Sequence, residues 1–233
     1  MMIHSAKTRG HADHGWLKSY HTFSFADYYN PERMNFGALR VLNDDSVDPG
    51  MGFGRHPHRD MEIISIPLEG EVEHQDSEGN HSVIQKGEVQ VMSAGTGILH
   101  SEFNPSKNNP AKFLQIWVLP KKLGIKPRYE QKRFPLEERR EHFQLVVSPD
   151  GREGSLAINQ DAFFSLRHLS SGSEASYTKY LPNNGAYLFI ISGEVEIDGK
   201  PFGPRDGVGI KDLERISIKA KSEAELLVME VPV

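Results

Sequence analysis

The stretch Gly50 to Asn104 carries His56-Pro57-His58 near its start and His100-Ser101-Glu102 near its end. Side chains two residues apart leave the same side of the chain only where the backbone is extended, as on a strand. Pro57 disfavours helix and biases the residue before it toward extended geometry. Two such strands facing each other across a barrel would bring three imidazoles and one carboxylate together.

This set of donors predicts a metal site. Three imidazoles and one carboxylate suit Fe(II), Mn, Co, Ni, Cu(II) or Zn, and they leave open positions for water, dioxygen or substrate. A structural zinc site would more often be closed and rich in sulfur, and the chain has no cysteine. The alternative is four unrelated polar residues in loops, and two equally spaced pairs in a glycine-rich β context argue against it.

The composition is that of an ordinary globular protein. At 233 residues the chain is long enough for one large or two small domains without disulfide support. A net charge of −5 and a pI of about 6.1 provide no general attraction to nucleic acid or to an anionic membrane, so neither is expected as a direct partner. No run approaches the ~20 apolar residues that span a bilayer, residues 1–10 lack an apolar segment, and we expect a cytoplasmic protein.

Short β-strands separated by turn signals follow from residue 36 onward. Turns are indicated at residues 48–50, 77–80 and 86–87, where Gly, Pro, Asn and Asp gather. This punctuation predicts an antiparallel barrel or sandwich with little helix. The strands are expected at residues 36–42, 63–73, 82–84, 89–93 and 113–119.

An internal repeat predicts two such barrels. Residues 64–73 match residues 188–196 when Gly70 is set on Gly193, an offset of 193 − 70 = 123 residues. At this offset His56 falls on Lys179 and no histidine follows His168, so the second barrel is expected to lack the metal site. The predicted division is a metal-binding domain at 1–120, a connector at 121–141 ending in a short solvated helix, and a degenerate domain at 142–233.

The first 35 residues predict an aromatic flap over the first barrel, which either simply packs there or also lines the mouth of a pocket. Four histidines in or near this segment have irregular spacing, which argues against a second metal site. Met51, Phe53 and Phe36 are candidates for an apolar pocket wall, with ordinary core as the alternative. The flap aromatics are Trp16, Phe23, Phe25, Tyr28 and Tyr29, and the histidines are His4, His11, His14 and His21.

The motifs resemble those of a known superfamily. Gly50-x5-His56-x-His58-x3-Glu62, followed by Gly70, resembles the first cupin motif, and Gly87, Gly95, Gly97 and His100-x3-Asn104 resemble the second. More narrowly, residues 56–62 (HPHRDME), 68–70 (LEG) and 93–102 (SAGTGILHSE) resemble the pirin family, and residues 21–29 (HTFSFADYY) are similar to bacterial pirin-like quercetinases. The resemblance implies an all-β bicupin, with two antiparallel jelly-roll barrels packed together.

The resemblance also implies a ligand set and an activity. In many cupins the carboxylate ligand comes from the first motif, here Glu62, but in pirins it comes from the second. The implied metal ligands are therefore His56, His58, His100 and Glu102, with Glu62 left as a candidate for supporting them. The implied activity is that of a quercetin 2,3-dioxygenase, which opens a flavonol with dioxygen and releases carbon monoxide. Fe(II) is the favoured metal, and Glu102 is the candidate catalytic base for the flavonol 3-hydroxyl proton.

Two other functions stay open. Pirins also include metal-dependent, redox-responsive partners of transcription factors, so the same ligands could hold a sensor iron that acts on an unidentified protein partner. A cupin isomerase or sugar-binding module would share the fold. In the enzyme hypothesis the partners are a flavonol and dioxygen, and a monomer is plausible because the two barrels already pack on each other.

Overall fold

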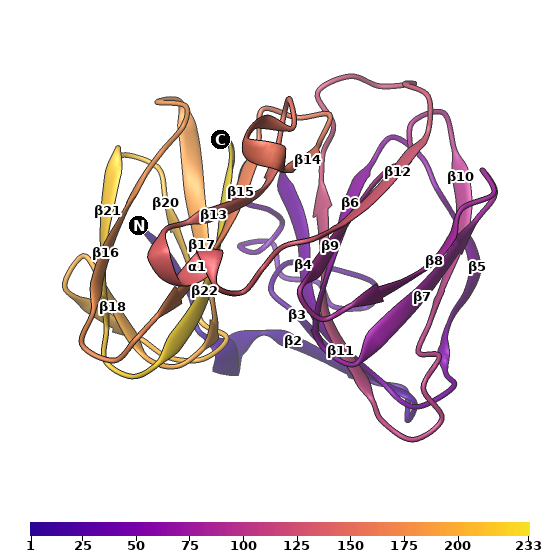
Figure 1. Ribbon diagram of the computed structural model, residues 1–233, viewed down its shortest axis with the longest axis horizontal. Coiled ribbons are helices and arrows are strands. Elements are labelled where there is room, and N and C mark those ends of the chain that lie inside the picture. Colours follow the sequence, from indigo (N-terminus) through magenta and orange to yellow (C-terminus); the bar gives the residue numbers. More distant parts are fainter.

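The computed structural model describes residues 1–233 and consists almost entirely of β-strands. Two barrels lie side by side, one built from the first half of the chain and the other from the second half (Figure 1). Each barrel pairs a seven-stranded sheet with a four-stranded sheet. The predicted all-β bicupin is therefore confirmed.

In the first barrel all strand pairs are antiparallel. Its large sheet contains, in spatial order, β12 (Arg128–Arg133), β9 (Glu88–Ser93), β6 (Glu62–Glu69), β11 (Ala111–Val118), β4 (Leu39–Val47), β3 (Leu17–His21) and β2 (Gly10–Asp13). Its small sheet contains β5 (Gly52–His58), β10 (Ile98–Phe103), β7 (Glu71–Asp76) and β8 (His81–Gln85).

The second barrel repeats this plan, with one parallel pair between β13 and β14. Its large sheet contains β1 (Met2–His4), β20 (Gly207–Ile210), β17 (Asn184–Ser192), β22 (Ala224–Pro232), β15 (Phe163–Leu169), β13 (Gln144–Ser148) and β14 (Leu156–Ala157). Its small sheet contains β16 (Glu174–Thr178), β21 (Arg215–Ala220), β18 (Val195–Ile197) and β19 (Lys200–Phe202). The helical turns are η1 (Ala6–Thr8), α1 (Glu138–Glu141) and η2 (Arg152–Gly154).

Two segments pair in ways that the sequence did not predict. Strand β1 hydrogen-bonds to β20, so the N-terminus crosses to the second barrel (Figure 1). Strand β12 lies in the expected connector and pairs with β9 of the first barrel. The flap prediction is wrong for residues 10–21, because β2 and β3 extend the large sheet through β4. Only the loop that follows β3 resembles a flap.

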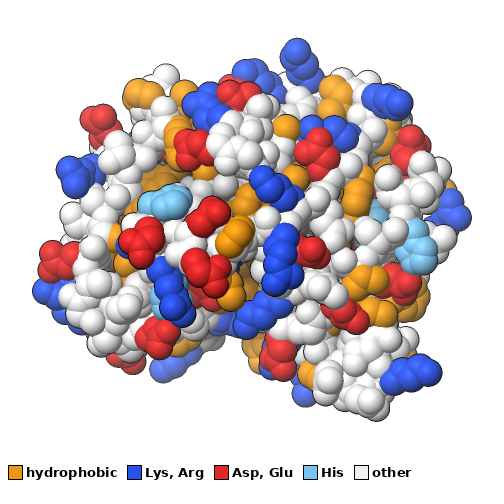
Figure 2. Space-filling model, in the orientation of Figure 1, with side chains coloured by type: hydrophobic (Ala, Val, Ile, Leu, Met, Phe, Trp, Pro, Cys, Tyr) orange, Lys and Arg blue, Asp and Glu red, His pale blue; other side chains and the backbone are white.

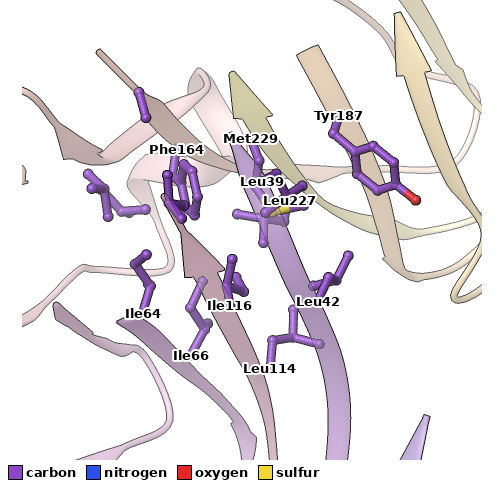
Figure 3. Packing of buried hydrophobic residues seen from close by; sticks show 14 of the residues in the cluster. Leu39, Leu42, Ile64, Ile66, Leu114, Ile116, Phe164, Tyr187, Leu227 and Met229 are labelled. Atoms are coloured by element: carbon purple, nitrogen blue, oxygen red, sulfur yellow. The ribbon is translucent and has the colours of Figure 1, made fainter. Parts of the chain in front are cut away.

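The two large sheets share one apolar core between the barrels. A cluster of 26 buried residues combines Leu42, Ile64 and Leu114 of the first sheet with Leu227 and Met229 of the second (Figure 3). These side chains alternate along their strands with residues that face the barrel interiors. Each large sheet therefore packs one face in this shared core and turns the other face to the interior of its own barrel. The residues on the interior face can differ between the two barrels.

The barrel interiors do differ. The interior of the second barrel is filled by 16 buried apolar residues. In the first barrel two small apolar clusters, of six and four residues, lie toward opposite ends of β11, near Phe113 and Trp117. Polar side chains occupy the region between these clusters, including Gln115 of the same strand. The first barrel therefore has an interior that can hold a polar site.

The duplicated origin is visible at two equivalent turns. Gly70 ends β6 with φ 71°, and Gly193 ends β17 with φ 78°. A Cβ at Gly70 would lie 2.8 Å from the carbonyl oxygen of Pro110, and one at Gly193 would clash with the carbonyl oxygen of Glu223. Both turns thus press against the chain just before the neighbouring strand, β11 or β22, and both require glycine.

The surface matches the modest net charge. On the face seen in Figure 2, acidic and basic side chains are interspersed over both barrels. None of the helical segments has the length and apolar character that crossing a membrane would require.

Candidate metal centre

The pairing of β5 with β10 brings the predicted histidines together. His56 and His100 are directly opposite each other in this antiparallel pair, and their Nε2 atoms are 2.9 Å apart. The His58 ring centroid lies 4.9 Å from that of His56 and 4.8 Å from that of His100. The expectation that the two strands face each other across the barrel is wrong, since they are hydrogen-bonded neighbours in the small sheet.

Glu102 lies beyond an irregularity in this pairing, between His100 and Glu102. Its buried carboxylate accepts hydrogen bonds from Ser65 Oγ at 3.2 Å and from Gln115 Nε2 at 2.6 Å, both from the facing large sheet. His100 belongs to two groups whose ligand atoms all lie within 4.8 Å of one another. One group is His56, His58 and His100, and the other is His74, His100 and Glu102.

Burial sets the charge of these groups. It raises the pKa of Glu102 to about 7, against the opposing effect of the hydrogen bonds from Ser65 and Gln115. Burial, with a smaller contribution from the neighbouring imidazoles, lowers the pKa of His58 to about 4 and that of His100 to about 2. The two histidines are therefore neutral near pH 7, which is the state in which imidazole binds a metal.

The tautomer of His56 is fixed by the backbone. Its Nδ1 lies 2.8 Å from the carbonyl oxygen of Gly54, which can only accept a hydrogen bond. The proton of the neutral ring is therefore on Nδ1, and the Nε2 lone pair points toward His100. A hydrogen bond of this kind to the distal nitrogen is usual for histidines that bind metals.

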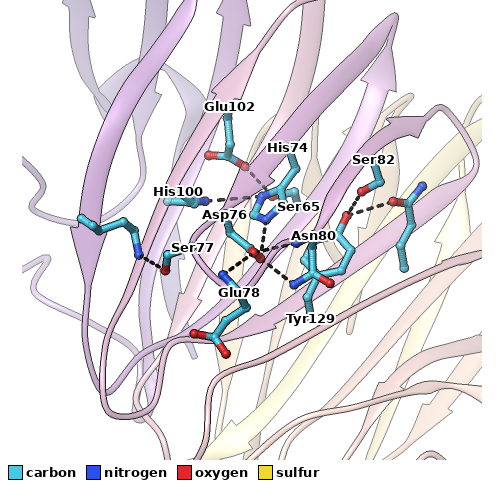
Figure 4. Close-up of polar contacts among 12 residues, drawn as sticks. Ser65, His74, Asp76, Ser77, Glu78, Asn80, Ser82, His100, Glu102 and Tyr129 are labelled. Atoms are coloured by element: carbon cyan, nitrogen blue, oxygen red, sulfur yellow. Dashed lines mark hydrogen bonds and ion pairs between the residues drawn. The ribbon is translucent and has the colours of Figure 1, made fainter.

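His74 on β7 contacts the His100 ring at its Nδ1 atom (Figure 4). The Nδ1 atoms of the two rings are 3.5 Å apart, and Nε2 of His74 lies 3.1 Å from Oδ2 of Asp76. Asp76 is held in turn by the backbone N–H groups of Glu78 and Asn80, which donate to its Oδ1. Sequence reasoning missed His74, although it stands two residues before Asp76 on a strand whose alternate residues are buried.

A cavity of about 550 Å³ opens beside His56, His58 and Glu102. Phe25 and Tyr28 of the N-terminal loop line it, together with Phe53 and Trp117. The ring of Trp117 meets that of His58 edge to face, with 4.9 Å between centroids. The lining contains no lysine or arginine. The predicted pocket role of this loop is confirmed for Phe25 and Tyr28.

Other predicted wall residues have different positions. Phe53 lines the cavity as predicted, but Met51 is 42% exposed at the surface. Phe36 is buried in the core between the barrels, so the alternative of ordinary core is confirmed for it, and the pocket-wall prediction is wrong for Met51. Of the remaining flap aromatics, Phe23 is in that same core and Tyr29 is 72% exposed. Trp16 reaches the site only indirectly, by packing on Phe53.

The structure also shows where the scattered N-terminal histidines and Glu62 lie. His11, His14 and His21 line the same cavity, although they form no cluster of metal-binding geometry. His4 instead lies 2.8 Å from the hydroxyl of Tyr187 in the second barrel. Glu62 does not support the histidines, because its carboxylate accepts from Ser93 Oγ at 2.7 Å and from the backbone N–H of Asn159 at 3.2 Å.

A pattern in the sequence could have identified the residues that were missed. Ser65, Gln90 and Gln115 are each a single polar residue between two apolar residues of a predicted strand. All three are buried, because the flanking residues face the core between the barrels and the polar residue faces the barrel interior. An isolated polar residue on the inner side of an otherwise apolar strand indicates a polar interior.

The second barrel has no comparable cluster. Lys179, which the repeat aligns with His56, is buried, and its Nζ donates to the carbonyl oxygens of Pro182, Asn184 and Lys211 at 2.6 to 3.0 Å. Both groups of metal-binding geometry lie in the first barrel.

Comparison with known proteins agrees with this architecture. Residues 3–118 match the family model described as Pirin, and residues 145–231 match the model described as the quercetinase C-terminal cupin domain. The chain is 48% identical over 230 residues to the quercetin 2,3-dioxygenase of Escherichia coli, covering 99% of this chain and 98% of that protein. It is 43% identical over 222 residues to a pirin-like protein of Caulobacter vibrioides, covering 95% of each.

Solved structures give the same result. The chain superimposes on a crystal structure of an E. coli bacterial pirin in complex with nickel(II) with a TM-score of 0.94 and 46% identity. The match covers 99% of this chain and 98% of that one. Both barrels and their connection are therefore shared along the whole length, and the chain belongs to the pirin family.

Proposed function

We propose that the protein is a metal-dependent dioxygenase that opens the heterocyclic ring of a flavonol such as quercetin. The observation that carries this proposal is the cavity of about 550 Å³, which has His56, His58 and Glu102 in its lining and aromatic side chains around them. A cavity of this size accommodates a flat molecule of three rings. The relative named quercetin 2,3-dioxygenase, at 48% identity, supports the same chemistry.

The donor set fits a divalent first-row metal. His56, His58, His100 and Glu102 are the proposed ligands, since three imidazoles and one carboxylate suit such ions. When bound, the metal would polarise the flavonol oxygens and bring dioxygen next to the ring. Fe(II) remains the favoured ion for this chain, and the related pirin crystallised with nickel(II) supports a divalent ion in general.

Glu102 is the proposed base. Burial raises the pKa of its carboxyl group, which favours uptake of a proton by the carboxylate. It would accept the proton of the flavonol 3-hydroxyl, while Ser65 and Gln115 hold the carboxylate in place through their hydrogen bonds. The overall reaction consumes one flavonol and one dioxygen, and it yields one phenolic ester that carries a carboxyl group and one carbon monoxide.

The aromatic rings would orient the flat substrate. Phe25 and Trp117 meet edge to face at 5.4 Å between centroids, so they form one continuous aromatic surface beside His58. A flavonol lying against this surface would present its ring edge to the histidines. The apolar rings in the lining would also limit the access of water to the anionic substrate.

Oxygen uptake and carbon monoxide release test the proposal directly. Protein loaded separately with iron, nickel, copper or manganese is mixed with quercetin, and both gases are measured against flavonol loss. We expect equal amounts of the three, and a loss of at least ~100-fold in rate for Glu102→Gln, as is typical when a general base is removed. Metal binding at one equivalent without flavonol loss under any of these metals would reject the enzyme and favour the redox-responsive regulatory protein.

A further inference from the structure

A row of polar side chains crosses the inner face of the large sheet in the first barrel. The strand registers place Gln90 opposite Ser65, Ser65 opposite Gln115, Gln115 opposite Asn43, and Asn43 opposite His21. Directly opposite residues of antiparallel strands project from the same face. All five are buried, so the row is a continuous polar band inside the barrel.

The members of this band differ in their hydrogen bonding. Ser65 Oγ shares its one proton between Gln115 Oε1, at 2.8 Å, and Glu102 Oε1, at 3.2 Å, and Gln115 Nε2 donates to Glu102. By contrast, Asn43 Oδ1 and His21 Nδ1 are buried and have no hydrogen-bond partner. Asn43 and His21 both line the cavity. Because buried polar atoms are nearly always paired, an unpaired couple in a cavity wall indicates that a ligand supplies the partners.

The next row of the same sheet extends this wall. Ser19 and Asp45 are opposite each other on β3 and β4, both are buried, and both line the cavity. The Ser19 hydroxyl donates to one oxygen of Asp45, which leaves the other lone pairs of the carboxyl group to accept from a ligand. Two adjacent rows of short polar side chains therefore face the same cavity.

The chemistry of this wall selects the kind of ligand. Burial lowers the pKa of His21 to about 4, so the imidazole is neutral and offers one donor and one acceptor. Asp45 and Glu102 are in the lining without any lysine or arginine, which disfavours phosphate and carboxylate ligands. Neutral groups that both donate and accept, such as phenolic hydroxyls, match this wall.

We propose that His21 and Asn43, with the Ser19–Asp45 pair beside them, bind the hydroxyl groups of a planar polyhydroxylated aromatic ligand. This inference deepens the proposed function, because it concerns the same cavity, and it assigns substrate selection to the large sheet. The histidines and Glu102 engage the reacting edge of the ligand. The polar wall then distinguishes a hydroxylated ligand from a bare aromatic one.

Binding measured without turnover tests this assignment. The zinc-loaded protein, kept under nitrogen, is titrated with quercetin and with 3-hydroxyflavone, which keeps the 3-hydroxyl and the adjacent carbonyl but lacks the other hydroxyls. Wild type is expected to bind quercetin roughly tenfold more tightly or better, since two net hydrogen bonds correspond to about that factor. Asn43→Leu and His21→Phe are each expected to reduce this preference roughly fivefold, with little change for 3-hydroxyflavone.

Thr22→Val is the matched control. Its Oγ1 is also buried and unpartnered, but Thr22 does not line the cavity, so the preference should be unchanged. Asn43→Leu should fold and melt at or above the wild-type temperature, because it removes an unpaired polar group. The inference is overturned if wild type shows no preference, or if Asn43→Leu and His21→Phe retain it. If the protein prefers quercetin in binding but consumes no flavonol, only the proposal that it is a dioxygenase is rejected.

Discussion

Nε2 of His56 and Nε2 of His100 lie 2.9 Å apart, although neither atom is bonded to anything else in the protein. Two ligand nitrogens at right angles around an ion, each about 2.1 Å from it, would be separated by about 3 Å. The β5–β10 register thus sets the two imidazoles at the spacing that a first-row metal requires. The geometry is built by the backbone, because the two residues are directly opposite in the strand pair.

Removal of His100 should abolish metal binding. His100→Ala is expected to lose the ion, because His100 is the residue that joins the three imidazoles to the group containing Glu102. Elemental analysis of protein purified by gel filtration measures the metal per chain. His81→Ala is the control, since this exposed imidazole lies on β8 beside Glu73. One full equivalent retained by His100→Ala would show that other residues bind the metal.

His74 should tune metal affinity without binding the metal itself. His74→Phe keeps the ring that stacks on Tyr129, at 4.5 Å between centroids, but removes the link between His100 and Asp76. Loss of such an outer hydrogen bond typically weakens metal binding about 10–100-fold. Competition with a chromophoric chelator measures this affinity. An unchanged affinity would mean that His74 only fills space behind the metal site.

Two glycines of β5 should differ sharply in their tolerance of a methyl group. A Cβ at Gly52 would clash with the backbone oxygen of Glu102 and with Cα of Phe103, whereas one at Gly54 meets nothing within 4 Å. Gly52→Ala should therefore push β5 away from β10, which would lower stability by about 1–3 kcal/mol and weaken metal binding. Gly54→Ala should do neither. Thermal melting and the chelator assay compare the two, and equal behaviour would contradict the close strand contact.

Much of the fold could be predicted from the sequence, because it depends on local signals. Turn residues between short β segments predicted the central strands, and the match between Gly70 and Gly193 predicted the second barrel. The pairing of β1 with β20 could not be predicted, since an N-terminal strand of three residues carries no signal for a partner some 200 positions away. Such non-local pairings are decided by the tertiary structure.

The candidate site was predictable to a similar extent. The i, i+2 spacing predicted that the three histidines and Glu102 act together, because period two is a property of the strand itself. That His74 stands behind His100 depends on the β10–β7 register, which no local pattern specifies. The same applies to Asn43 and His21, whose adjacency follows from the β4–β3 register.

Asp45 should make the protein less stable as the pH rises from about 4 to 7. Burial is the main reason that its pKa rises from 3.8 to about 7, and the nearby charges of Asp44 and Glu102 add to the effect. Between these two values the folded protein holds a proton that the unfolded chain has released, so this group lowers stability progressively as the pH rises from about 4 to 7. The cost is fully present above pH 7 and absent below the unfolded pKa.

Asp45→Asn isolates this contribution. The amide oxygen can still accept the hydrogen bond from Ser19, and the buried histidines, which act in the opposite direction, are common to both proteins and cancel in the comparison. The advantage of the variant over wild type should be greater at pH 8 than at pH 5 by on the order of 2 kcal/mol, from 1.36 kcal/mol per pKa unit. Urea unfolding of both proteins, after dialysis against EDTA, measures the difference. An advantage that does not change with pH would mean that Asp45 is ionised in the folded protein at pH 5.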